Sequence, residues 1–318
     1  MPCGGSEMSK DWLSRLSRVA TIILLLVALS VISPAFLSAQ NLTNVLRQAS
    51  LLFLLAAGLT VVILTAGIDL SIGSVLALSA SVAANFIQQG WVWGGSLIGL
   101  FIGAACGLLN GLMVALIGLP AFIATYGMLW VAAGFAQVFM KGEIISGFPT
   151  SFRLLGAGHL LGIPVPILVM AAVLAAVAFT LRRTSFGRYV YAIGANREAA
   201  RLSGINIRGN LLLVYSLSGL VSAFAGLVYV SRINAVESTI GEPLLLPALA
   251  AVCIGGTSLF GGEGGIEGTL VGALIMTLVT NGMNLLNVSP YWQSFVMGAI
   301  VVLAVAIDQL GSEKAGRT

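Results

Sequence analysis

Ten stretches of mostly apolar residues follow one another along the chain, and each is long enough to cross a membrane or nearly so. A helix needs about 20 apolar residues to span the hydrocarbon core of a bilayer. The stretches cover residues 19–37, 48–66, 72–87, 96–117, 120–140, 164–181, 211–230, 244–260, 268–287 and 291–308. The third and eighth are short and flanked by glycine, so we expect half-helices or tilted helices there. The pattern predicts an all-α polytopic membrane protein with about ten transmembrane helices.

The composition excludes a soluble globule as well. Apolar residues make up 58% of the chain and charged residues only 8%, whereas soluble domains carry roughly a quarter charged residues. The three cysteines do not have the spacing of a metal site or of a disulfide framework. The chain also lacks a Gly-x4-Gly-Lys-Ser/Thr phosphate loop. If ATP drives this protein, we expect ATP and magnesium to be bound by a partner chain, with no cofactor or metal bound here.

The basic residues indicate the orientation, because cytoplasmic loops of membrane proteins carry an excess of Lys and Arg. With ten spans and an inside N-terminus, eleven basic residues fall on the cytoplasmic side, namely Lys10, Arg15, Arg18, Arg182, Arg183, Arg188, Arg197, Arg201, Arg208, Lys314 and Arg317. Four fall outside, namely Arg47, Lys141, Arg153 and Arg232. We therefore predict a single membrane domain over 1–318 with both termini cytoplasmic. Its segment 1–18 and loop 182–210 would be cytoplasmic, and its loop 141–163 extracytoplasmic.

The beginning of the chain allows one alternative. A basic stretch, an apolar run and the sequence Pro34-Ala-Phe-Leu-Ser-Ala39 loosely resemble a cleavable signal peptide. The apolar run is long, however, and its removal would leave an odd number of spans. We therefore expect the first helix to be retained.

Small residues recur every four positions in two spans. Gly99, Gly103, Gly107 and Gly111 lie along one ridge of the fourth span, as Ser218, Ser222 and Gly226 do in the seventh. Helices in lipid associate through close backbone contact across small residues. The pattern favours static tight packing over a surface on which helices slide.

A polar break interrupts the apolar pattern at Gly67-Ile-Asp-Leu-Ser-Ile-Gly-Ser74. A carboxylate at membrane depth is costly unless it faces a cavity, a partner or a helix N-terminus. Asp69 and Ser71 stand just before the third span, where either side chain can cap the helix. The alternative is a broken helix that lines the substrate path or its gate. A second glycine-rich break, Gly255–Gly265, interrupts the other half, as in transporters with internal repeats.

Uncharged polar residues mark further inward positions within the spans. Asn281, Asn284 and Asn287 are spaced three apart and predict a polar stripe on the ninth span, while Asn110 and Thr125 lie in other spans. A path lined in this way suits a neutral hydroxylated solute, which needs hydrogen bonds but no counter-charge. For any one of these residues, interhelical hydrogen bonding is the competing explanation.

The inside connection 184–207 carries the most specific pattern. Residues 196–203 are predicted to form a short helix, with Asn196 as its N-cap and Gly204 as its terminator. A short helix that projects from a membrane domain can be held by a soluble partner, whose motion then moves the membrane helices. Juxtamembrane positive charge without a partner is the alternative.

The same connection resembles a known family. Glu198-Ala199-Ala200-x3-Gly204 is similar to the loop by which bacterial ABC-importer permeases contact their ATP-binding subunit. The string from Gly187 to Asn206 resembles the ribose/xylose/arabinose branch of these permeases. Further similar stretches are Thr60–Gly73, Ala121–Thr125 and Gly255–Thr269. The resemblance extends over about residues 45–308.

The resemblance implies a permease subunit of an ATP-driven importer in the bacterial inner membrane, and not an enzyme. It implies an ATPase-coupling loop that includes Gly187, Arg188, Asn196, Glu198, Ala199, Ala200, Arg201 and Gly204. A periplasmic or lipid-anchored sugar-binding protein would dock on the outside loops 141–163 and 231–243. A second permease chain, identical or paralogous, would complete the channel. The cargo would be a neutral sugar, such as a ribose-like pentose, a hexose or a related polyol.

Two alternatives stay open at this stage. The same machinery can import nucleosides or branched-chain amino acids, although an amino-acid zwitterion would favour charged groups that the spans barely offer. A stand-alone secondary transporter or facilitator would explain the spans and polar residues. It would leave the Glu198–Gly204 loop without a purpose.

Overall fold

The computed structural model describes the backbone of residues 4–315 and the side chains of residues 18–306. It is almost entirely helical. The helices are α1 (Gly4–Ile32), α2 (Ala39–Leu64), α3 (Ile72–Gln88), α4 (Val92–Leu112), the π-helical turn η1 (Met113–Ile117), α5 (Ala121–Met140), α6 (Thr150–Ala157), α7 (Val165–Arg183), α8 (Ser185–Ala195), α9 (Arg197–Leu202), α10 (Ile207–Ile233), the 3-10 turn η2 (Glu242–Leu244), α11 (Leu245–Ile254), α12 (Ile266–Leu285) and α13 (Pro290–Ala315). Four two-residue strands complete the fold, namely β1 (Ile145–Ser146), β2 (His159–Leu160), β3 (Ile163–Pro164) and β4 (Ala235–Val236).

The helical membrane architecture is confirmed at a coarse level. Within the described residues, six helices are long and apolar enough to cross a membrane: α2, α4 with η1, α5, α7, α10 and α12. Four shorter apolar helices cover residues 18–32, 72–88, 242–254 and 290–306. Each of the ten predicted apolar stretches therefore contains a helix, and the count of ten spans stays a prediction.

Several predicted boundaries were wrong. The eighth stretch does not continue as a helix to residue 260, because α11 ends at Ile254 and is followed by Gly255 and by Gly256 at φ +80°. The second helix begins at Ala39 instead of residue 48, since the Ser38 hydroxyl accepts the N–H of Asn41 and caps it. The apolar part of the first helix covers residues 18–32, so the predicted start was right and the predicted end at residue 37 was wrong.

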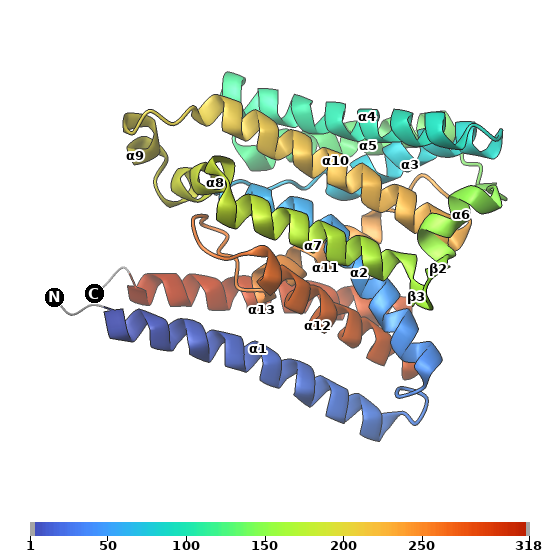
Figure 1. Cartoon of the computed structure of the whole chain (residues 1–318), viewed down its shortest axis with the longest axis horizontal. Coiled ribbons are helices and arrows are strands. Elements are labelled where there is room, and N and C mark those ends of the chain that lie inside the picture. Colours follow the sequence, from blue (N-terminus) through green and yellow to red (C-terminus); the bar gives the residue numbers. More distant parts are fainter. Residues whose placement is uncertain (1–3, 316–318) are drawn as a thin grey trace.

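The bundle has two distinct ends (Figure 1). The start of α1 and the end of α13 lie at the end that carries α8 and α9, while α6, β2 and β3 lie at the opposite end. Two of the four basic residues predicted outside lie at this opposite end, one within a helix there and one in contact with a strand there. Arg153 is in α6, and Arg47 Nη2 lies 2.6 Å from His159 Nε2 of β2. The side of the membrane on which each end lies stays a prediction.

The strands join two connections that are far apart in the sequence. β1 pairs antiparallel with β4, so that Ile145 opposes Val236 and Ser146 opposes Ala235. Connections 141–163 and 231–243, both predicted outside, therefore form one surface.

Close backbone contact between α4 and α10 holds one side of the bundle. Gly103 and Gly107 face Gly219, and a Cβ on any of the three would overlap the backbone of the facing helix. The ridge predicted from the spacing of glycines is confirmed as a tight packing surface, as expected where small residues let helices approach in lipid.

Gly107→Ala is expected to destabilise the chain. The new methyl would overlap the Tyr215 carbonyl, and such overpacking costs about 1–3 kcal/mol. The matched control is Gly134→Ala in α5, where a Cβ meets no atom within 4 Å and alanine favours the helix. Thermal unfolding in detergent should show a lower midpoint for Gly107→Ala alone. A midpoint equal to that of the control would show that the two helices can separate at no cost.

Candidate functional site

The break between α2 and α3 places a carboxylate in the interior of the bundle. Asp69 is 1% exposed, and its Oδ1 accepts hydrogen bonds from the Ser71 N–H at 3.0 Å and the Ser71 hydroxyl at 2.6 Å. Its Oδ2 accepts from the Ser218 hydroxyl of α10 at 2.8 Å. The carboxylate therefore ties the break to a helix 149 residues away in the chain.

Two more of the predicted residues join this cluster. The Asn110 amide of α4 donates to the Ser71 hydroxyl at 2.8 Å, and the Thr125 hydroxyl of α5 contacts the Ile68 carbonyl at 3.1 Å. Both residues are fully buried. The side chain of Ser71 makes no capping bond to α3, so the simple capping interpretation was wrong for that residue. Asp69, Ser71, Asn110 and Thr125 together connect the break to α4, α5 and α10.

The cluster also contains polar atoms without a partner among the described residues. The Asn110 Oδ1 atom and the Tyr215 hydroxyl are buried and accept or donate no hydrogen bond there. Buried polar groups in proteins are usually paired. The Tyr215 oxygen lies beside Gly67, since a Cβ on Gly67 would stand 2.6 Å from it. The interior around the break thus retains unused hydrogen-bonding capacity.

The structure does not bring Asn281 and Asn284 to this cluster. Asn281 exchanges two hydrogen bonds with Asn41 at the start of α2, of 2.8 and 3.1 Å, and Asn284 accepts from Gln293 at 2.9 Å. The predicted stripe of three asparagines was wrong, because α12 ends at Leu285 and Asn287 adopts φ +54° beyond it. In this conformation both residues make interhelical contacts.

The predicted short helix in the inside connection is confirmed. α9 spans Arg197–Leu202, the Asn196 side chain caps it by accepting the Ala199 N–H at 2.9 Å, and Gly204 follows in the left-handed region at φ +80°. Ala200 is the buried residue of α9, 4% exposed. The helix thus packs on one side and presents its other side to solvent at the end of the bundle (Figure 1).

An ion pair lies on the exposed side of α9. Arg201 Nε and Nη2 donate to the two oxygens of Glu198 at 2.9 and 2.5 Å. These bonds from a guanidinium lower the pKa of Glu198 below its ordinary value. Because both side chains are exposed, the pair contributes little to stability. It fixes the charge pattern that a partner would meet.

Helix α8 connects α9 to the membrane helices. Gly187 is buried, and its N–H donates to the Thr184 hydroxyl at 3.2 Å, while Arg188 is exposed. The Tyr191 hydroxyl donates to the Gly264 carbonyl at 2.9 Å, and Gly262 N–H donates to the Leu64 carbonyl at 3.0 Å.

An ion pair of 2.7 Å between Arg182 and Glu267 joins the end of α7 to the start of α12. The second glycine-rich break therefore contacts both α8 and the end of α2, and Leu64 stands five residues before Asp69.

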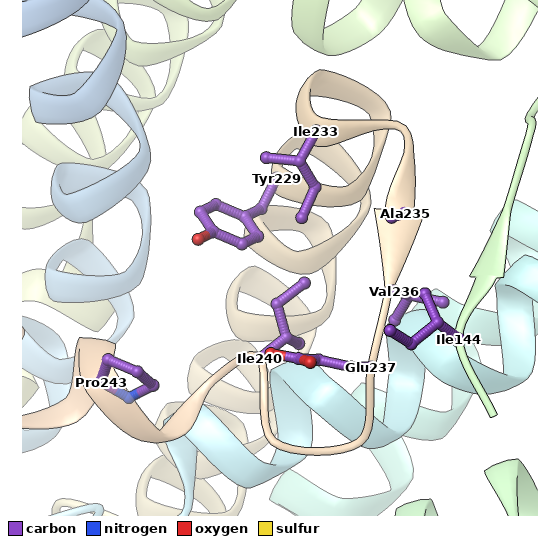
Figure 2. Close-up of a pocket in the computed structure, with 8 residues that line it drawn as sticks. All are labelled: Ile144, Tyr229, Ile233, Ala235, Val236, Glu237, Ile240 and Pro243. Carbon is purple, nitrogen blue, oxygen red and sulfur yellow. The ribbon is translucent and has the colours of Figure 1, made fainter. Parts of the chain in front are cut away.

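A cavity of about 290 Å³ lies beside the end of α10 and β4 (Figure 2). Its lining residues are Ile144, Tyr229, Ile233, Ala235, Val236, Glu237, Ile240 and Pro243. The Tyr229 hydroxyl and the Glu237 carboxylate supply its polar groups. The loop after α10 forms most of its wall (Figure 2). The cavity lies where the β1–β4 pairing joins the two predicted outside loops.

Sequence reasoning missed the partners that complete these sites. Ser218 had been noted only for its small size, and its bond to Asp69 depends on how α10 packs against the break. Tyr191 and Gly262 carry no local signal for the contacts that they make. Glu237 and Tyr229 form a cavity wall only after β1 and β4 pair.

The comparisons with known proteins decide the family. Residues 41–305 match the family model described as branched-chain amino acid transport system / permease component. The chain belongs to this permease family. The permease is 41% identical to the ribose import permease protein RbsC of Escherichia coli K12 over 313 residues, which cover 96% of this chain and 97% of the relative.

Other relatives are similar over most of their length. The ribose import permease protein RbsC of Bacillus subtilis is 41% identical, covering 91% of this chain and 90% of the relative. The fructose import permease protein FrcC of Rhizobium meliloti is 39% identical, covering 91% and 83%. A solved inward-facing ABC transporter of metal-chelate type is 18% identical, with a TM-score of 0.49 over 95% of this chain and 99% of the other. As a permease, the chain is a multi-pass membrane protein and a transport subunit.

Proposed function

We propose that this permease is the membrane-spanning subunit of an ATP-driven, binding-protein-dependent importer of a neutral sugar, with a ribose-like pentose as the first candidate. The single observation that carries the proposal is α9, a capped and exposed short helix that is connected through α8 and the second glycine-rich break to the end of α2. The import permeases of ribose and fructose among its relatives support the substrate class.

The proposed topology has ten spans, formed by the six long helices and the four shorter ones. In it, 1–318 is one domain in the bacterial plasma membrane. The end with α8 and α9 is cytoplasmic, together with segment 1–18, loop 182–210 and both termini. The loop 141–163 faces the outside.

The proposed partners follow from the two ends. An ATP-binding subunit, which carries ATP and magnesium, would hold α9 through the exposed Glu198–Arg201 pair and the neighbouring Arg188, with Gly187 and Ala199 keeping the backbone in place. A sugar-binding protein would dock on the joined outside loops, above the 290 Å³ cavity. A second permease chain, identical or paralogous, would complete the channel.

The cluster around Asp69 is proposed to lock the broken segment rather than to contact the sugar directly in this conformation. Asp69, Ser71, Asn110 and Thr125 are all fully or almost fully buried and engaged with one another or with nearby backbone. ATP-driven movement of α9 would be transmitted through the Gly262–Leu64 contact and would open this lock. Asn281 and Asn284 stay candidates for lining the substrate path in a conformation in which their hydrogen bonds to other helices are broken.

Reconstitution tests the proposal. Proteoliposomes are prepared with the permease, the ATP-binding subunit encoded beside it and the corresponding binding protein. They should take up labelled ribose only when ATP is present on the side of the ATP-binding subunit. Omission of any one component should abolish uptake. Uptake by the permease alone, without ATP, would contradict the proposal and would identify a stand-alone facilitator.

The description of the family model favours a second candidate cargo, branched-chain amino acids, and nucleosides form a third class. Calorimetry on the corresponding binding protein with pentoses, hexoses, polyols, nucleosides and leucine separates these classes. We expect binding of a sugar. Binding of leucine or of a nucleoside alone would keep the importer and change its cargo.

A further inference from the structure

A second cavity, of about 440 Å³, lies beside α9. Leu116 and Gly118 line it on the side of η1. Arginines line the facing side, namely Arg197 and Arg201 of α9 and Arg208 of α10. One wall of the cavity is therefore apolar, and the other combines the arginines with Ile205, Asn206 and Ile207.

The cavity lies at the ends of two apolar helices that are long enough to span a membrane. The span that begins at Val92 ends at Ile117, and the next long span on the other wall begins at Ile207. Leu116 and Ile117 are 53% and 70% exposed, as is Phe122 at 56%. Exposed apolar side chains at the end of a span face acyl chains, whereas arginines just beyond it face the headgroups.

The positive charge on this side of the cavity is only partly neutralised among the described side chains. Glu198 pairs with Arg201, whereas neither Arg197 nor Arg208 forms an ion pair among residues 18–306. Two guanidinium groups therefore line the cavity without an anionic partner among the described side chains. Guanidinium groups bind phosphate oxygens through charge-assisted and often bidentate hydrogen bonds.

The apolar wall has an unusual backbone. α4 widens into the π-helical turn Met113–Ile117, and Gly118 ends it at φ +81°, with the Leu119 N–H bonded to the Met113 carbonyl at 3.0 Å. π-helical turns are rare and are frequent at functional sites. Here the turn sets Leu116 against the cavity.

We propose that this cavity binds the phosphate headgroup of an anionic phospholipid of the cytoplasmic leaflet. Arg197 and Arg208 would hold the phosphate, and the acyl chains would lie along Leu116, Ile117 and Phe122. Basic pockets between helices on the cytoplasmic side recognise such headgroups. A lipid bound there bridges η1 to α9 and α10, and so restrains the helix that the ATPase would move.

Native mass spectrometry of the delipidated full-length chain tests this proposal. Phosphatidylglycerol is titrated against phosphatidylcholine of equal chain length, with wild type compared with Arg197→Gln/Arg208→Gln. We expect the double variant to bind phosphatidylglycerol about 25-fold more weakly, fivefold for each arginine. The matched control is Arg183→Gln/Arg188→Gln, which removes the same charge from exposed cytoplasmic-end positions outside the cavity and should bind like wild type.

Two further arms identify the ligand. Arg197→Lys/Arg208→Lys keeps the charge and should retain most of the lipid binding. Retained binding would show that substitution at these two positions does not by itself misfold the chain. Inorganic phosphate at millimolar concentration should not displace the lipid, because it lacks the acyl chains.

Equal binding of phosphatidylcholine, equal loss in the control, or displacement by inorganic phosphate would overturn the proposal. So would a glutamine variant that binds lipid normally but no longer co-purifies with the ATPase, since the arginines would then bind acidic groups of that subunit.

Discussion

Asp69→Ala is expected to abolish transport and to lower the stability of the permease in the membrane. The substitution removes the three hydrogen bonds that the carboxylate accepts from Ser71 and Ser218. It leaves both hydroxyls buried without that partner. The loss should amount to about 3 kcal/mol, at about 1 kcal/mol for each bond. The break between α2 and α3 would then be held to α10 by packing alone.

Unfolding in mixed micelles by SDS, together with ribose uptake in proteoliposomes, measures both effects. Asp69→Asn is the matched variant. The amide oxygen can keep the Ser71 bonds and the amide nitrogen can donate to Ser218, so stability should stay close to that of wild type. An alanine variant as stable as wild type would contradict the lock. An asparagine variant that is stable but inactive would show that the negative charge itself takes part in gating.

Gly204→Val should uncouple ATP hydrolysis from transport while the chain remains in the membrane. Gly204 ends α9 at φ +80°, with no atom within 4 Å of a built Cβ. The expected effect is therefore backbone strain and not steric overlap. A left-handed conformation costs an L-residue about 1–2 kcal/mol, which is about a tenfold loss in the population of the docked geometry. Uptake should fall about tenfold relative to ATP hydrolysis.

The chain offers a matched control for this prediction. Gly142 has φ +78° and equally open surroundings, but it lies at the other end of the bundle, after α5. Gly142→Val should therefore keep the coupling ratio of wild type. Gly204→Asn should recover most of the activity, because asparagine tolerates the left-handed region. A normal coupling ratio in Gly204→Val would count against a role of α9 in docking. Glu198→Lys, which reverses one charge of the exposed pair, is expected to act in the same direction.

Features determined by local sequence were predicted well. Apolar length indicates membrane helices because the bilayer thickness sets it, and all ten stretches contain a helix. The cap at Asn196 and the stop at Gly204 were predicted because each depends on the preference of a single residue for one backbone conformation. The glycine ridge of α4 follows from its spacing of four residues. In each case the interacting atoms are near in sequence or repeat along one helix.

Features set by tertiary packing were not predicted. The bond between Asp69 and Ser218 joins residues 149 positions apart, and the sequence offers no way to choose Ser218 over the other buried serines. Asn281 and Asn284 are residue types that suit a polar path. In the structure, however, Asn281 bonds to Asn41 and Asn284 bonds to Gln293. Both cavities form only after distant segments meet.

The central claim is that a separate ATP-binding subunit holds α9 on the cytoplasmic side. Leu202 of α9 is 74% exposed and Leu161, at the opposite end, is 95% exposed, so Leu202→Cys and Leu161→Cys in a cysteine-free background make a matched pair. The assembled complex carries a short thiol-reactive photo-crosslinker at either position. We expect Leu202→Cys to crosslink to the ATP-binding subunit and to be shielded from an impermeant thiol reagent added outside, whereas Leu161→Cys is labelled from outside and does not crosslink to that subunit. Labelling of Leu202→Cys from the outside, or no crosslink from it in the assembled complex, would contradict the account.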